Sequence, residues 1–180
     1  MMSAEQEREV VRQVLDGNTA KFADIVREYQ DSVAHLCFRL AGGRLDVEEI
    51  VQQVFVELYS ALARFRFESK LGTFIYRITV NVVSKNMKHE QRRVSIDANG
   101  DFLTTEIDGG AEEKIFKDEQ NIQLRKAIGQ LKAEQRTALV LFAFEDFSYN
   151  EIADVMQISL SKVESLIFRA KKNLRKMLMK

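Results

Sequence analysis

Apolar residues recur every three or four positions along most of this chain, which is the spacing of one face of an α-helix. No proline interrupts the pattern anywhere in the 180 residues. Polar turns and glycines divide the pattern into separate segments. We therefore predict helices over about residues 4–15, 20–40, 46–62, 73–88, 112–131, 134–144 and 148–156, with a longer last helix from about residue 162.

The third segment shows how helix ends and faces follow from side-chain chemistry. Asp46 is a good N-cap, with Glu49 three positions later to complete a capping box, and Gly42-Gly43 ends the helix before it. The face that we expect to be buried carries Ile50, Val54, Leu58 and Leu62. The opposite, polar face carries Glu48, Glu49, Gln52, Gln53 and Glu57.

Helical spacing is lost between residues 94 and 113. This stretch contains three glycines and six acidic residues but no basic one. We interpret it as an acidic linker which, if flexible, spans about 25 Å. The sequence therefore predicts an all-α protein with two small helical domains, residues 1–93 and 114–180, joined by the linker 94–113.

The net charge of zero conceals an uneven distribution of charge. Residues 161–180 include seven basic residues and one acidic residue, and residues 84–93 include four basic residues and one acidic residue. Two basic patches separated by an acidic stretch are typical of surfaces that bind a polyanion.

The C-terminal segment has the form of a helix-turn-helix. Ser148 and Glu151 form a capping box at the start of a short helix, and Ile158 lies in the turn, where it can fill the core. In the second helix the apolar stripe is Val163, Ile167, Ala170 and Leu174. Burial of that stripe leaves an outward face of Lys162, Ser165, Phe168, Arg169, Lys172 and Lys176. Such a face fits the major groove of duplex DNA, with cations on phosphates.

Aromatic and basic residues alternate densely between residues 63 and 88. In the helix from Thr73, the residues Phe74, Ile78 and Val82 are expected to face the core. Another face of this helix carries Arg77, Asn81, Lys85 and Lys88, and the loop before it carries Arg64, Phe65, Arg66, Phe67 and Lys70.

This mixture suits single-stranded or locally melted nucleic acid. Aromatic rings stack on unpaired bases, which contributes about 1–3 kcal/mol per base, while cations follow the backbone. The alternative is that the aromatic side chains pack the core of a small helical domain. For Phe74 the core position is favoured, and for Phe65 and Phe67 the residues alone leave both interpretations open.

The residue types give little support for a catalytic, metal-binding or redox function. Cys37 is the only cysteine, and it lies in an apolar run where we expect an inert, buried thiol in a reducing compartment. His35 and His89 share no metal-ligand spacing. The N-terminal residues do not resemble a signal peptide, and no apolar run approaches membrane-spanning length. We predict a cytoplasmic protein without metal, cofactor or enzymatic activity.

Two long motifs resemble the bacterial sigma factors of the extracytoplasmic-function (ECF) group. "DVEEIVQQVFVELYSALARFRFESKLGTFIYRITVNVVSK" is similar to the first domain of that family, and "AIGQLKAEQRTALVLFAFEDFSYNEIADVMQISLSKVESLIFRAKKNLRKML" to the second. The resemblance covers nearly the whole chain apart from the termini and the acidic linker. It implies a subunit that binds core RNA polymerase and promoter DNA, and that an anti-sigma factor holds inactive.

The resemblance also assigns roles to residues. Those implied to dock on core polymerase are Asp46, Glu49, Gln52 and Gln53. Those implied to hold the −10 strand, with a flipped base in the loop, are Arg64, Phe65, Arg66, Phe67, Lys70, Arg77, Asn81, Lys85 and Lys88. Those implied to read the −35 element are Lys162, Glu164, Ser165, Phe168, Arg169 and Lys172. Binding energy for unstacked bases offsets the cost of opening the duplex, so no catalytic group is needed.

Several positions depart from the family pattern. Phe74 replaces the usual tryptophan, and Glu164 and Leu166 stand where lysine and arginine are frequent. One explanation of Glu164 is structural, since Ser161 and Glu164 have capping-box spacing at the start of the last helix. The other is that its carboxylate accepts a hydrogen bond from a cytosine amino group. Leu166 widens the apolar stripe.

Two other functions explain less of the sequence than a sigma factor does. A helix-turn-helix regulator that binds duplex without polymerase leaves the aromatic and basic loop unexplained. A nuclease needs a carboxylate cluster or a nucleophile with its base, and the clustered acidic residues lie in the glycine-containing linker.

Overall fold

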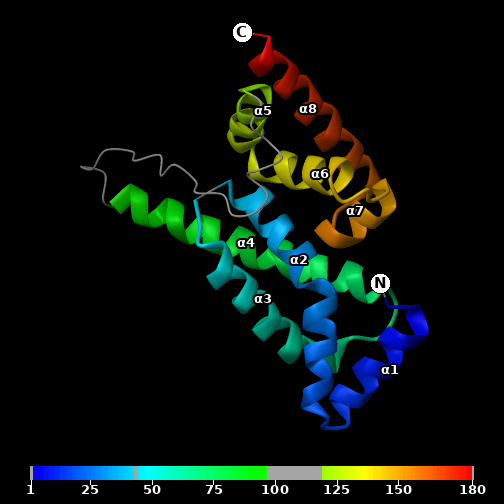
Figure 1. Cartoon of the computed structure of the whole chain (residues 1–180). Helices are drawn as coiled ribbons and strands as arrows, with labels where there is room; N and C mark the ends of the chain where they lie inside the picture. Colours follow the sequence, from blue (N-terminus) through cyan, green and yellow to red (C-terminus); the bar gives the residue numbers. More distant parts are fainter. Residues whose placement is uncertain (1, 43, 97–118, 180) are drawn as a thin grey trace.

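The computed structural model describes residues 2–42, 44–96 and 119–179 (Figure 1). Every regular element in these ranges is helical, as the sequence predicts. The elements in chain order are α1 (Ala4–Leu15), the 3-10 turn η1 (Thr19–Lys21), α2 (Phe22–Ala41), α3 (Val47–Ala61), the 3-10 turn η2 (Leu62–Arg64), α4 (Leu71–Ile96), α5 (Glu119–Gln130), α6 (Ala133–Ala143), α7 (Tyr149–Met156) and α8 (Leu160–Leu178). We call the described residues up to 96 the N-terminal half and those from 119 the C-terminal half.

The N-terminal half is a bundle in which α2, α3 and α4 pack against one another and α1 packs against α2. Its core is built from the apolar stripes of these helices, as expected. The residues with no exposed surface include Val11, Ile25, Val33, Leu36, Cys37, Val54, Leu58, Leu62 and Ile75. Burial raises the pKa of the Cys37 thiol to about 12, which keeps it protonated and confirms the predicted buried cysteine.

Local signals in the sequence account for the helix boundaries here. Gly42 adopts φ 59°, the left-handed conformation that ends α2 after Ala41. Asp46 caps α3, and its carboxylate accepts hydrogen bonds from the backbone N–H groups of Glu48 and Glu49 at 3.0 and 3.2 Å. The predicted N-cap is therefore confirmed, but Glu49 does not complete the predicted capping box.

The fourth helix is longer than predicted. The sequence places its end near Lys88, but α4 continues to Ile96 because no glycine or proline interrupts residues 73–99. Residues 94–96 of the predicted linker are therefore helical. The rest of that linker, residues 97–113, lies outside the described residues.

The C-terminal half consists of α8 packed against α5, α6 and α7. The predicted capping box at α7 is confirmed: the Ser148 side chain accepts from the Glu151 N–H, and the Glu151 carboxylate accepts from the Ser148 N–H at 3.0 Å. Ile158 in the turn packs against the core, also as predicted. Gln157 ends α7 with φ 54°.

The two halves are packed directly on each other, which the sequence did not predict. Helix α7 lies against α4, and α6 lies against α2. The Tyr76 ring lies 4.9 Å from the Phe147 ring, and its hydroxyl donates to Glu145 at 2.8 Å. Arg39 pairs with the same carboxylate at 2.8 Å. Burial, followed by the nearby Glu145 charge, raises the pKa of Tyr76, so its hydroxyl remains a donor.

Among the helices of the described ranges, none combines the length and apolarity needed to cross a membrane.

Candidate nucleic-acid interface

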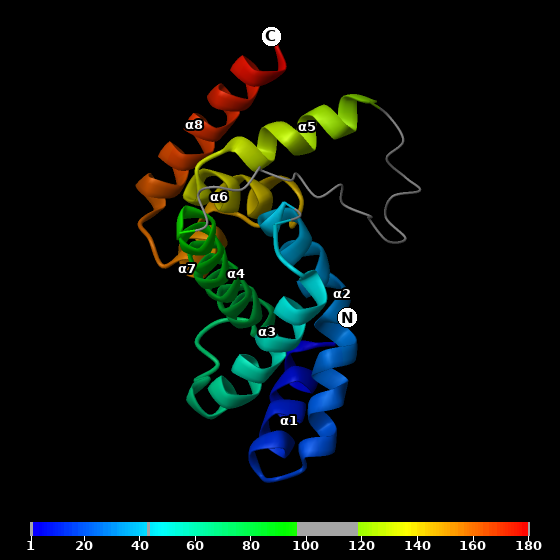
Figure 2. The same cartoon turned by 90° about the vertical axis from the view of Figure 1, so that its left-hand side faces the viewer.

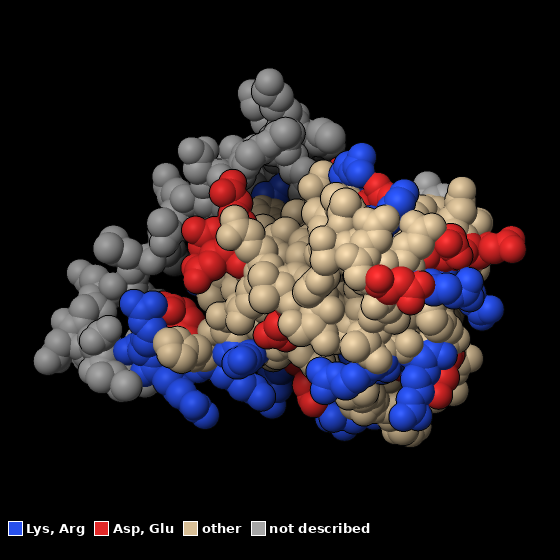
Figure 3. Space-filling model, turned by 90° about the horizontal axis from the view of Figure 1, so that it is seen from below, with Lys and Arg blue, Asp and Glu red and all other residues tan. Residues whose placement is uncertain are grey.

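Helices α8 and α4 and the connection before α4 lie along one side of the molecule, the left-hand side of Figure 2. Lysine and arginine side chains gather along the corresponding edge, the lower one in Figure 3. Such a row of cations favours the approach of a polyanion.

Helix α8 has the division of faces that the sequence predicts. Val163, Leu166, Ile167 and Ala170 are buried, so Leu166 does widen the apolar stripe. The residues predicted to contact the −35 element lie on the other face: Lys162, Glu164, Phe168, Arg169 and Lys172 are exposed, and Ser165 is half-buried. Phe168 is 68% exposed among these cations, which is unusual for a large aromatic side chain. Their role in binding stays a prediction.

The start of α8 differs from the prediction. Ser159, not Ser161, is the N-cap, and its hydroxyl accepts from the Lys162 N–H at 3.3 Å. Ser159 has the extended backbone of an N-cap, and the helix begins at the next residue, Leu160. Ser161 therefore lies inside the first turn. The capping explanation of Glu164 is therefore wrong. Its exposed carboxylate lies in the second turn.

Lys162 has a partner within the protein. Its ammonium pairs with Glu134 of α6 at 2.9 Å, and both side chains are about half exposed, at 45% and 60%. Exposed pairs of this kind contribute about 0–1 kcal/mol because water competes for both ions. A phosphate can therefore replace Glu134 at little cost.

The aromatic residues before α4 pack mainly on one another. The α3–α4 loop, residues 65–70, contains Phe65, whose ring lies 4.7 Å from that of Phe67 and 4.8 Å from that of Phe74. Phe65 is only 8% exposed. The structure thus favours the packing interpretation for Phe65, whose ring is not free to stack on a base. Phe67 is half-buried, and its φ of 58° is uncommon for a bulky residue.

The cations of the loop remain in solvent. Arg64, Arg66 and Lys70 are exposed, and Lys70 pairs with Glu151 of α7 at 3.3 Å. Lys70 is 80% exposed, so this pair is strongly screened.

Helix α4 presents three of its four predicted strand-contacting residues to solvent. Asn81, Lys85 and Lys88 are exposed, whereas Arg77 is half-buried and its Nε is buried without a hydrogen-bond partner. Of the expected core stripe, Ile78 and Val82 are buried as predicted, whereas Phe74 is only half-buried and its neighbour Ile75 is fully buried.

The polar face of α3 presents part of its predicted docking set. Asp46 is engaged as the N-cap, and Gln53 accepts a hydrogen bond from Asn86 at 2.8 Å. Glu49 and Gln52 are exposed. Sequence reasoning missed Val56, which lies on the same face one turn beyond Gln52 and is 67% exposed. The signal was the run Val54-Phe55-Val56, since a helix cannot bury three consecutive apolar side chains on one face.

No group of three or more His, Cys, Asp or Glu side chains in the described part of the chain is arranged to hold a metal ion.

Two family comparisons match the two halves of the fold. Residues 25–93 match Sigma-70 region 2, and residues 121–174 match Sigma-70, region 4. The first range covers α2, α3 and α4, and the second covers most of α5 to α8.

Curated relatives match along almost the whole chain. The RNA polymerase sigma-H factor of Pseudomonas aeruginosa is 32% identical over 187 residues, covering 99% of this chain and 96% of the relative. The ECF RNA polymerase sigma-E factor of Escherichia coli K12 is 32% identical over 171 residues, covering 90% of this chain and 88% of the relative. The chain belongs to the ECF group of RNA polymerase sigma factors.

Solved structures share the fold. The sigma factor RpoE from Bartonella quintana, crystallised with the anti-sigma factor NepR, is similar with a TM-score of 0.72 and 20% identity, covering 88% of this chain and 96% of that one. CnrH in complex with the cytosolic domain of CnrY has a TM-score of 0.66 and 22% identity, with coverage of 95% and 96%.

Proposed function

We propose that this protein binds core RNA polymerase, directs it to a set of promoters and stabilises the opened DNA, without itself catalysing a reaction. The observation that carries the proposal is the presence of two different basic surfaces on one side of the molecule. One is the regular outer face of α8, and the other combines the α3–α4 loop with α4. A repressor that binds only duplex has no use for the second surface. The site of action is the cytoplasm, where polymerase meets DNA.

The −35 element is the proposed ligand of α8. Lys162 and Lys172 are positioned to contact phosphates, and Arg169 and Ser165 base edges. Phe168 offers an apolar contact for the methyl group of a thymine. Glu164, freed from the capping role, accepts from a cytosine amino group.

The melted −10 strand is the proposed ligand of the second surface. Arg64, Arg66, Lys70, Lys85 and Lys88 supply charge along the backbone. Asn81 offers an amide to a base, and Phe67 is the loop aromatic available for stacking. Phe65 packs against the Phe67 ring and so helps to hold it in place, and Arg77 lies at the start of this face.

Core polymerase is the proposed partner of α3. Glu49, Gln52 and Gln53 form the polar part of this docking surface, with Asp46 fixing the start of the helix. Val56, one turn beyond Gln52, adds an exposed apolar contact to this surface, as is typical of protein interfaces. An anti-sigma factor is the proposed inhibitor, and it acts by covering this same face.

In the proposed division of roles, residues 1–93 dock on polymerase and capture the strand and residues 114–180 bind duplex. The linker between them is the predicted stretch 94–113, of which residues 94–96 still belong to α4. Duplex and single-strand binding then belong to separate parts of one chain.

Transcription by purified core polymerase tests the proposal. Genomic DNA is transcribed with and without this protein, the 5′ ends are sequenced, and opening at a promoter so found is followed by permanganate reactivity of unpaired thymines. We expect open complexes only when core and this protein are both present. R169A should weaken promoter recruitment, and N81A should weaken opening more than recruitment. K21A is the matched control. It also removes a cation, but Lys21 belongs to neither proposed DNA surface and pairs with Asp24 on α2. Strong duplex binding without core, and no opening with it, would contradict the proposal and favour an ordinary regulator.

A further inference from the structure

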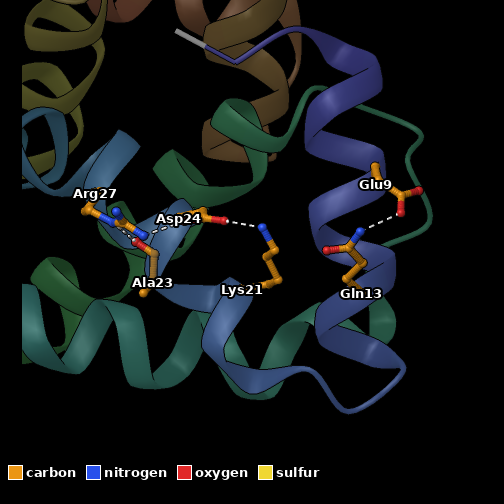
Figure 4. Close-up of polar contacts among 6 residues, drawn as sticks. All are labelled: Glu9, Gln13, Lys21, Ala23, Asp24 and Arg27. Atoms are coloured by element: carbon orange, nitrogen blue, oxygen red, sulfur yellow. Dashed lines mark hydrogen bonds and ion pairs between the residues drawn. The ribbon is translucent and has the colours of Figure 1, made fainter.

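Helix α1 precedes both ranges matched by the family comparisons, the first of which begins at residue 25. It is nevertheless fixed to the fold, since Val11 and Val14 are buried in the core. Helix α1 also contacts η2, the turn that leads directly into the α3–α4 loop. The chain between α3 and α4 runs alongside α1 in Figures 1 and 4.

Arg8 projects from α1 onto the loop. Its guanidinium carbon lies 5.7 Å from the centre of the Phe67 ring, over the face of that ring. This distance is within the range of a cation–π contact. The Phe65 ring contacts Phe67 as well, at 4.7 Å. A base that stacks on the face of Phe67 beneath Arg8 must take the place of the guanidinium.

The charge of Arg8 is available for another partner. No carboxylate among the described residues forms a salt bridge with Arg8. Arg12, one turn later, is paired with Glu9 at 3.3 Å, and Glu9 also accepts from Gln13 at 2.7 Å (Figure 4). Phe67 also has a left-handed backbone conformation, which costs energy for a bulky residue. Such strain is typical of positions where the placement of the side chain matters for function.

We propose that Arg8 is a strand-contacting residue of the −10 surface: a base displaces its guanidinium from the Phe67 ring, and the guanidinium then pairs with a neighbouring phosphate. The inference rests on the proposed single-strand role of the loop. It extends that surface to α1, outside the matched family ranges. Because the cation–π contact is exchanged for a charge–phosphate contact, the displacement has a small net cost.

Salt dependence tests the phosphate contact directly. The affinity for a single strand falls with salt, and each phosphate contact steepens the slope of log affinity against log salt concentration by about 0.7. Holoenzyme made with wild type, R8A, R8K or R12A is titrated with a single-stranded oligonucleotide that carries the −10 sequence of a promoter found by transcript sequencing. We expect R8A to lower the slope by about 0.7, and R8K and the control R12A to leave it unchanged.

Arg8 is exposed, so the variants should fold, and thermal melting of each one checks this. An R8A slope equal to that of wild type overturns the proposal, even if the affinity falls, because a residue that only positions Phe67 does not change the number of phosphate contacts. If wild-type holoenzyme fails to bind the strand, the single-strand role of the loop fails first and the role of Arg8 with it. Wild-type binding with equal slopes refutes the role of Arg8 alone.

Discussion

The two regions of this sigma factor that we propose to bind DNA, α8 and the α3–α4 loop, place their aromatic residues in opposite ways. On α8, Phe168 stands 68% exposed on a helix whose apolar stripe is buried beneath it. In the α3–α4 loop, Phe65 is 8% exposed and is covered by the rings of Phe67 and Phe74. The same residue type thus offers a contact surface in one region and supports the fold in the other.

The difference has a simple physical origin. A helix has two fixed faces, so its periodic stripe decides which side chains are buried and which are left for a partner. A loop has no such period, and its aromatic side chains bury one another unless the backbone holds them apart. Phe67 remains half-buried at the edge of this cluster, with an unusual backbone conformation. The loop binds, in our proposal, through Phe67 and its cations.

Replacing each of the two contrasted aromatic residues by alanine gives the largest expected effect. F65A should lower the free energy of unfolding by about 3 kcal/mol, because a buried ring is removed and leaves a cavity. F168A should change it by less than about 0.5 kcal/mol, as exposed positions do. F168A should instead weaken duplex binding by about fivefold, roughly 1 kcal/mol. Urea unfolding and promoter binding by holoenzyme measure the two quantities.

The opposite results for F65A and F168A would contradict this contrast between the two regions. A stable F65A protein with poor promoter opening would return Phe65 to the single-strand surface and make its burial incidental. A destabilised F168A protein would mean that its exposed ring packs on something within the chain.

Much of the fold could be predicted because it follows local rules. Helix α1 has the predicted bounds, Ala4–Leu15, and the Asp46 and Ser148 caps are where the sequence places them. These features depend on apolar spacing and on a side chain bonding to backbone a few residues away. The cations on α8 and α4 are exposed for the same reason, with the partial exception of Arg77.

What could not be predicted depends on contacts between distant residues. Glu145 receives hydrogen bonds from Arg39 and Tyr76, 106 and 69 positions away, and no spacing in the sequence signals this. The contact of Arg8 with Phe67 is of the same kind. The error at α8 was different, since Ser159 and Ser161 both suit a cap, and only the backbone conformation distinguishes them.

A pair of serine variants sharpens the description of the α8 start. S159A should lower the free energy of unfolding by about 1 kcal/mol, because the Lys162 N–H loses its hydrogen-bond acceptor. S161A should have an effect below about 0.5 kcal/mol. Urea unfolding of the two proteins side by side is the measurement. Equal losses, or a larger one for S161A, would restore the capping explanation of Glu164 and remove the argument that its carboxylate is free to read a base.

The smallest expected effect concerns the ion pair of Lys70 with Glu151, which joins the α3–α4 loop to α7 of the C-terminal half. Hydrogen bonds from the Ser148 N–H and hydroxyl, with a smaller contribution from Lys70, lower the pKa of Glu151 below its ordinary value of 4.5. A lowered carboxyl pKa stabilises the fold above that ordinary value, and the stabilisation is lost as the pH falls through the lowered pKa.

The variant E151Q keeps an acceptor for the capping box and removes only the charge. Near pH 7 it should be less stable than wild type by a few tenths of a kcal/mol, since Lys70 is 80% exposed and Glu151 is partly exposed, so that water screens the pair. The difference should shrink as the pH falls below about 4.5, where the unfolded chain protonates Glu151 first, and disappear once the folded carboxyl is protonated at its lowered pKa. Urea unfolding across this pH range measures the difference. A constant difference would assign the effect to packing around α7, and the loop and the C-terminal half would then share no electrostatic link through Glu151.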